Sequence, residues 1–104
     1  MFSYEVNPND KHVSIKLKGD LDIEVTEIFE EIYGIVNPFT HIELDMEEVL
    51  FVDSTGIGLL MNLINSVKQN QEKTEIRMTN IQPLIRDVFE MLQLDKILGE
   101  DVFK

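Results

Sequence analysis

Two segments near the start of the chain alternate between apolar and polar residues. The alternation covers residues 2–6 and residues 13–17, and a period of two places the apolar side chains on one face of a strand. Between them, residues 7–10 are Asn-Pro-Asn-Asp, a sequence typical of turns. The pattern predicts an antiparallel hairpin, whose second strand is broken by Gly19 and Asp20.

Three later segments carry apolar residues at the spacing of a helix. The first covers residues 23–36 and the second covers residues 54–70. The third begins at Pro83, a residue that suits the first turn of a helix. Asp22 is placed to cap the first of these helices.

Short apolar strands separate the predicted helices. They are residues 41–45, residues 49–52 after a bend at residues 47–48, and a strand around residues 76–78. An apolar tail at residues 94–98 indicates a short final turn. The order of elements is therefore β-β-α-β-α-β-α.

This order predicts an α/β fold in a single domain over residues 1–104. The βαβαβ part implies parallel strands joined by right-handed crossovers, and the hairpin adds an antiparallel strand. We expect a mixed sheet with an antiparallel N-terminal hairpin and with helices packed mainly on one face.

Composition excludes several classes of function. The chain has 104 residues, 43% of them hydrophobic, and a net charge of −11. Nucleic acids and polybasic membrane sites need Lys and Arg, so neither partner is expected. There is no cysteine for a disulfide or a thiol nucleophile. No apolar run approaches the ~18 residues of a membrane span, and no basic segment opens the chain, so we expect a cytoplasmic protein.

The acidic residues are unevenly distributed. Residues 19–67 contain 11 Asp and Glu residues and no Lys or Arg. One interpretation is a solvated face that keeps the protein in solution. The other is an acidic surface that steers a basic protein partner toward the chain.

Recognisable catalytic motifs are scarce in the sequence. His12 and His41 lie in separate predicted strands, without the spacing of metal ligands. Val52 stands where a nucleophile elbow needs glycine, Met61 stands where a dinucleotide fingerprint needs its third glycine, and no phosphate-binding loop is present. We therefore expect no cofactor and no catalytic metal, while a serine–histidine–acid triad stays open because triads assemble in space.

One segment, residues 51–58, runs from an apolar strand into the start of a helix. Asp53 or Ser54 is placed to cap that helix. Gly56 and Gly58 lower helix propensity in the first turns, so the presence of two glycines there needs an explanation. The reason is close packing on the sheet or the close approach of a partner backbone. An ordinary helix cap and a functional site are both compatible with this pattern.

Residues 52–58, Val-Asp-Ser-Thr-Gly-Ile-Gly, closely resemble the Asp-Ser-Ser/Thr-Gly-Leu-Gly motif of anti-sigma factor antagonists, small proteins of the STAS domain family. Residues 18–22 resemble the family's Gly-Glu-Leu-Asp turn, with Asp20 in place of the usual glutamate. Residues 84–89 resemble its late helix, so the resemblance spans nearly the whole chain.

The resemblance implies a regulatory switch and no enzyme activity. In this family, a partner that is both anti-sigma factor and serine kinase phosphorylates the serine after the aspartate, here Ser54. The unphosphorylated form binds the anti-sigma factor and frees the sigma factor, and a phosphatase resets the switch. Sporulation and general stress control both remain open as the pathway.

We expect the ends of neighbouring strands to bring Asp22 and Asp53 beside Ser54, with Thr55 as the rival phosphate acceptor. The expected partner-binding residues are Asp22, Asp53, Ser54, Thr55, Gly56 and Ile57. Two alternatives remain: a STAS scaffold module in a signalling assembly or in transporter regulation, and a small hydrolase that uses Ser54.

Overall fold

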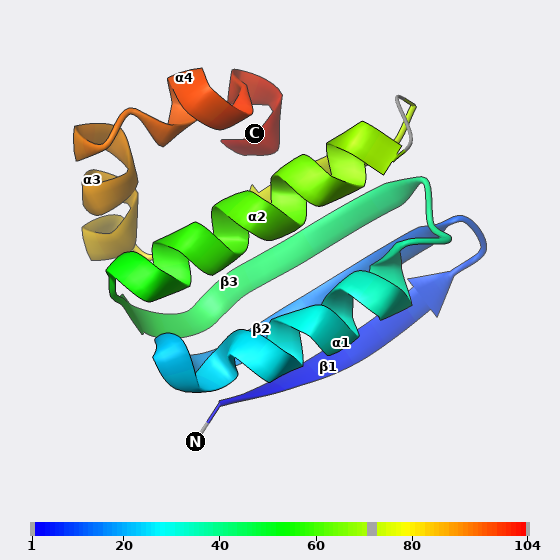
Figure 1. Cartoon of the computed structure of the whole chain (residues 1–104), viewed down its shortest axis with the longest axis horizontal. Helices are drawn as coiled ribbons and strands as arrows, with labels where there is room; N and C mark the ends of the chain where they lie inside the picture. Colours follow the sequence, from blue (N-terminus) through cyan, green and yellow to red (C-terminus); the bar gives the residue numbers. More distant parts are fainter. Residues whose placement is uncertain (1, 71–72, 104) are drawn as a thin grey trace.

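The computed structural model describes residues 2–70 and 73–103 of the chain. Four strands form one sheet in the order β1-β2-β3-β4 (Figure 1). Their bounds are β1 Ser3–Asn9, β2 His12–Leu21, β3 His41–Val52 and β4 Glu75–Thr79. The β1–β2 pair is antiparallel and the other two pairs are parallel, so the predicted mixed sheet with its N-terminal hairpin is confirmed.

Helices cover one face of this sheet. Figure 1 shows α1 and α2 on the same face, and α3, α4 and η2 beyond α2 on its side away from α1. The bounds are η1 Ile23–Val25, α1 Thr26–Val36, α2 Ser54–Asn70, α3 Pro83–Met91, α4 Leu94–Leu98 and η2 Glu100–Phe103. Within the described residues, no helix has the length and apolar character needed to cross a membrane.

The core lies between the sheet and the two long helices. Alternate side chains of the central strands point toward α1 and α2, as a strand period of two requires. The fully or nearly fully buried residues include Val13, Ile15 and Leu17 of β2, Ile42, Leu44 and Met46 of β3, Phe29 and Ile32 of α1, and Leu60 and Ile64 of α2.

The hairpin turn lies later than the sequence predicted. β1 continues through residues 7–9, and Pro8 pairs with Val13. Because β1 is an edge strand, a proline there loses no hydrogen bond to a further strand. The turn falls at Asp10, whose φ of 59° lies in the left-handed region that Asp tolerates.

The predicted break in β2 and the predicted bend in β3 are both wrong. β2 passes through Gly19, which has a φ of 110°, and β3 is continuous across residues 47–48. The pairing register shifts twice, between Lys16 and Lys18 and between Lys18 and Asp20. At each shift β3 contributes one extra residue, as in a β-bulge, which interrupts its alternation of buried and exposed residues.

The bulges give the two leucines of β3 different environments, which a matched pair of substitutions tests. Leu44 is 0% exposed and Leu50 is 73% exposed. We expect Leu44→Ala to lower the free energy of unfolding by about 2–5 kcal/mol, because it leaves a cavity in the core. Leu50→Ala should change it by no more than about 0.5 kcal/mol. Urea unfolding of both variants measures this, and equal losses would contradict the described course of β3.

Candidate functional site

The residues around Ser54 lie where the two central parallel strands end. Leu21 of β2 pairs with Val52 of β3, and the next residues are Asp22 and Asp53. The Asp53 N–H donates a hydrogen bond of 3.1 Å to the Leu21 carbonyl oxygen. The two aspartates therefore follow neighbouring strand ends.

Asp53 caps α2, which decides between the two capping residues that the sequence allowed. Its Oδ1 accepts a hydrogen bond of 2.8 Å from the Gly56 N–H, and its carbonyl accepts one of 2.9 Å from the Ile57 N–H. Ser54 is the first residue of α2 and is exposed. Within the described part of the chain, its hydroxyl has no hydrogen-bond partner, so the side chain is left free at the surface.

Asp22 caps the other helical start at this end of the sheet. Its Oδ1 accepts a hydrogen bond of 2.9 Å from the Glu24 N–H, which confirms the predicted N-cap, although the first turn, η1, is a 3-10 helix. Among the described residues, neither Asp22 nor Asp53 takes part in an ion pair. The surface beside Ser54 therefore carries two carboxylates that only backbone N–H groups offset.

Gly56 is required by packing inside the chain. A Cβ at this position would clash with the Leu21 carbonyl oxygen and would lie only 2.7 Å from the Leu21 carbonyl carbon. The first turn of α2 thus rests on the end of β2. Gly58 differs, because it is exposed and a Cβ there would meet nothing within 4 Å.

The six expected partner-binding residues divide into two layers. Asp22 is half-buried, Asp53 is half-buried, and Ser54 and Thr55 are exposed. Gly56 and Ile57 are buried, Ile57 with 8% of its surface exposed, so their side chains do not lie at the surface with the others. They lie beneath the exposed part of the surface, and their contact with a partner stays a prediction.

Sequence reasoning missed three exposed apolar residues at this end of the sheet. Ile23 is 68% exposed directly after Asp22, and Leu50 and Phe51 are 73% and 52% exposed shortly before Asp53. Residues 49–52 had the composition of a buried strand, but after the register shifts in β3 Val49 is buried while the consecutive residues Leu50 and Phe51 are exposed. Exposed apolar side chains near polar groups are a feature of protein-binding surfaces.

The two histidines lie away from Ser54. His12 begins β2, His41 begins β3, and they pair across the strands with rings stacked 4.3 Å apart. Ser54 follows the opposite end of β3, so the length of that strand separates it from both histidines. A triad between Ser54 and either histidine is therefore not assembled, which removes the structural basis for the hydrolase alternative. No cluster of three metal-ligating side chains occurs among residues 2–70 and 73–103.

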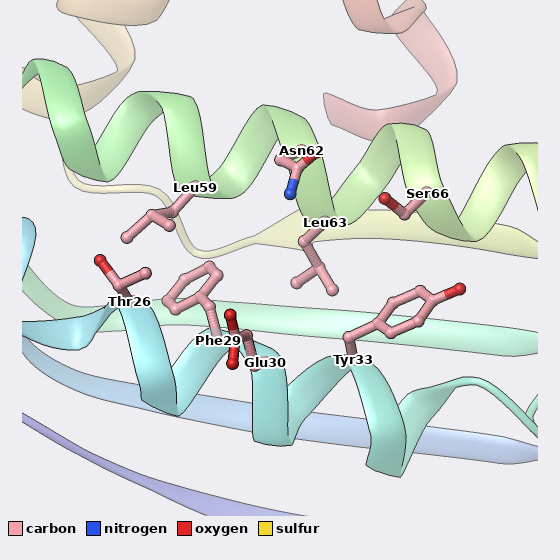
Figure 2. Close-up of a pocket in the computed structure, with 8 residues that line it drawn as sticks. All are labelled: Thr26, Phe29, Glu30, Tyr33, Leu59, Asn62, Leu63 and Ser66. Carbon is pink, nitrogen blue, oxygen red and sulfur yellow. The ribbon is translucent and has the colours of Figure 1, made fainter.

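A shallow hollow of about 200 Å³ lies between α1 and α2 (Figure 2). Figure 2 shows Phe29 and Leu63 pointing into the space between the two helices. Thr26, the first residue of α1, and Leu59, in the second turn of α2, line the end of the hollow where both helices begin. The polar side chains that line this hollow are Thr26, Glu30, Tyr33, Asn62 and Ser66.

The lysines of β2 lie on the face of the sheet away from the helices, where each contacts a carboxylate. Lys18 lies 2.9 Å from Glu5, and its hydrogen bond lowers the pKa of the Glu5 carboxyl. Lys16 lies 3.3 Å from Glu48 and 3.8 Å from Glu47, and Glu48 raises the pKa of Lys16. Neither lysine neutralises the aspartates at the end of β2 and β3.

Comparisons with known proteins match this arrangement over nearly the whole chain. A family model described as the STAS domain matches residues 3–104. An anti-sigma-B factor antagonist of Listeria monocytogenes is 27% identical over 104 residues, covering 92% of this chain and 85% of the relative. A protein of the same name from Staphylococcus aureus is 26% identical over 99 residues, covering 90% and 87%.

Solved structures share the fold. An anti-sigma factor antagonist from Mycobacterium paratuberculosis has a TM-score of 0.80 at 19% identity, covering 95% of this chain and 84% of that one. The Bacillus cell fate determinant SpoIIAA in its phosphorylated form has a TM-score of 0.65 at 23% identity, covering 90% and 86%. A sulfate transporter family protein from Wolinella succinogenes has a TM-score of 0.77 at 14% identity, covering 91% and 77%.

The contrast between Gly56 and Gly58 tests how the site is built. Alanine favours a helix over glycine by about 1 kcal/mol, so Gly58→Ala should raise the free energy of unfolding. Gly56→Ala should lower it by about 1–3 kcal/mol, because the added methyl group forces α2 away from Leu21. Thermal and urea unfolding of the two variants measure this. A stabilised Gly56→Ala variant would mean that α2 does not rest on β2.

Proposed function

Because the chain belongs to the STAS domain family, we propose that it is an anti-sigma factor antagonist switched by phosphorylation of Ser54. In this proposal the unphosphorylated chain binds an anti-sigma factor that is also a serine kinase, and so releases a sigma factor. The chain is the substrate of that kinase in the cytoplasm. It has no catalysis or cofactor of its own.

The free hydroxyl of Ser54 is the observation that carries the proposal. Because Asp53 caps α2, the Ser54 hydroxyl is not used as a helix cap. The exposed Ser54 side chain is therefore accessible to a kinase. The curated relatives named anti-sigma-B factor antagonist and the phosphorylated form of SpoIIAA support the same function. The choice of Ser54 over Thr55, which is also exposed, rests on the family resemblance.

The proposed switch consists of a phosphoryl transfer and a hydrolysis. The γ-phosphoryl group of ATP is transferred to the Ser54 oxygen, ADP leaves, and the hydroxyl proton goes to a base of the kinase. A phosphatase then uses water to release inorganic phosphate and restore the hydroxyl. The phosphate would lie at the positive end of the α2 dipole, so the fold tolerates the modification.

Phosphorylation of Ser54 is expected to affect partner binding more than the stability of the fold. A phosphate at Ser54 adds bulk and charge where Asp22 and Asp53 already lie, on the surface that a partner must contact closely. Desolvating the added charge in an interface costs more than the helix dipole returns. Phosphorylation is therefore expected to lower affinity and leave stability almost unchanged.

A scaffold role is the alternative. The structural likeness to a sulfate transporter family protein favours it, since the STAS fold also occurs outside sigma-factor control. A scaffold module would bind its assembly regardless of the state of Ser54.

Substitutions at Ser54 test the proposal against this alternative. With a purified anti-sigma factor encoded in the same genome, we expect Ser54→Ala to bind like the unmodified chain and to resist phosphorylation. Ser54→Asp should bind at least about tenfold more weakly, because a carboxylate must then be desolvated beside Asp53. Calorimetry gives the affinities, and melting temperatures should stay close together in all three proteins.

The control is Asp10→Asn, which removes one charge at the hairpin turn, at the other end of the sheet from Ser54. It should leave the affinity unchanged. If Ser54→Asp binds as tightly as the unmodified chain at equal stability, the switch proposal is wrong and the scaffold role is the better one.

A further inference from the structure

Two histidines and a glutamate lie in one row across the sheet, at the end opposite to Ser54. His12, His41 and Glu75 are the first residues of β2, β3 and β4. The pairing register aligns His12 with His41, and His41 with Glu75. The residue after each of them is buried in the core, so the alternation along a strand places all three side chains on the face of the sheet away from the helices.

Backbone hydrogen bonds hold the starts of these three strands together. The Lys11 carbonyl oxygen, just before β2, accepts hydrogen bonds of 3.0 and 3.2 Å from the N–H groups of Thr40 and His41. The Thr40 carbonyl oxygen accepts one of 2.8 Å from the Glu75 N–H. Because neighbouring strands lie about 4.8 Å apart, the three side chains start within reach of a single small ion.

The gap between His41 and Glu75 has the width of two ligands on one metal ion. The His41 Nε2 lies 3.5 Å from the Glu75 Oε2. Zinc binds imidazole nitrogen and carboxylate oxygen at about 2.0–2.2 Å, so two such ligands at the tetrahedral angle are about 3.3–3.5 Å apart. The observed separation therefore fits a tetrahedral ion without a change in the distance between these two atoms.

Thr40 and Lys11 provide the hydrogen bonds that a metal-binding His41 needs. The Nε2 atom binds a metal ion only when the ring proton is on Nδ1. The Thr40 Oγ1 lies 3.0 Å from Nδ1, where it can accept a hydrogen bond, and its own hydroxyl donates to the Lys11 carbonyl oxygen at 3.4 Å. A hydrogen bond of this kind fixes the tautomer and orientation of histidines that bind metals.

His12 becomes the third ligand through a rotation of its side chain. In the structure its ring stacks on that of His41, with centroids 4.3 Å apart and planes at 12°, so the three side chains do not converge on one point. His12 is exposed, and no other described part of the chain forms a hydrogen bond with its ring. A hollow of about 270 Å³, which all three residues line, leaves room for the rotation.

We propose that His12, His41 and Glu75 bind a divalent transition metal ion of the zinc class. Two imidazoles and a carboxylate are ligands that zinc accepts, and a water molecule completes the tetrahedron. Glu43 and Arg77 pair in the next row and line the same hollow, and their opposite charges leave Glu75 as the uncompensated anion. The ion ties three strand starts together, so its role is structural, and the inference does not rest on the proposed function.

Calorimetric titration of the full chain with zinc chloride is the first test, with Mg²⁺ in excess. Mg²⁺ prefers oxygen ligands, so it occupies exposed carboxylates without competing for imidazoles. We expect one zinc ion per chain, and a raised melting temperature because the ion binds the folded state. His12→Asn, His41→Asn and Glu75→Gln should each lower the affinity at least about tenfold.

The matched control is Glu90→Gln, which removes one carboxylate from an exposed position of α3. It should leave the zinc affinity unchanged. The metal-free variants should melt at the same temperature as the unmodified chain, because the substituted side chains lie outside the core.

Nuclear magnetic resonance of the ¹⁵N-labelled imidazoles is the second test, and it needs only the unmodified chain. We expect one nitrogen of each histidine ring to shift in step with the zinc concentration, while the His41 Nδ1 stays protonated. Absence of zinc binding in excess Mg²⁺, or equal affinity in the variant that lacks both histidines, would overturn the inference. A shift confined to one ring would mean an adventitious ion only and would overturn it as well. Because the row and Ser54 lie at opposite ends of the sheet, each of these failures leaves the proposed function standing.

Discussion

The contact between Gly56 and the carbonyl group of Leu21 is the constraint on which the candidate site depends. It lets the first turn of α2 rest on the end of β2, and the hydrogen bond from Asp53 N–H to the same carbonyl ties the strand ends together. With α2 held there, Asp53 caps the helix and Ser54 becomes the exposed first residue. Any side chain larger than hydrogen at position 56 would displace this whole arrangement.

The bulges in β3 are the second structural cause of the surface around Ser54. Each adds a residue opposite β2, and as a result Val49 is buried while Leu50 and Phe51 are both exposed shortly before Asp53. The surface that results combines carboxylates with exposed apolar side chains. Partner recognition by such a surface draws on both apolar burial and charge complementarity.

Most of the fold could be predicted from the sequence, because hydrophobic periodicity reports which face of an element is buried. The order of elements, the parallel crossovers and the Asp22 cap all follow from that pattern and from local capping rules. The failures occur where pairing between strands overrides local signals. Pro8 stays in an edge strand and Gly19 stays inside β2, and neither outcome is encoded within a few residues of sequence.

The site could be predicted only in part. Its motif is local, so the position of Ser54 at a helix start was accessible from the sequence. The burial of Gly56 and Ile57 and the exposure of Leu50 and Phe51 depend on contacts between distant segments. The sequence left the distance between the histidines and Ser54 open; in the structure His12 and His41 pair at the starts of β2 and β3, and the length of β3 separates both from Ser54.

The most direct measurement is the location of phosphate after the chain is incubated with its candidate anti-sigma kinase and Mg–ATP. Mass spectrometry of the digested product identifies the modified residue, and the Ser54→Ala variant serves as the control. We expect one phosphate on Ser54, none on Thr55 and none on the variant. Phosphate on Thr55, or undiminished phosphorylation of Ser54→Ala, would contradict the assignment of Ser54 as the switch.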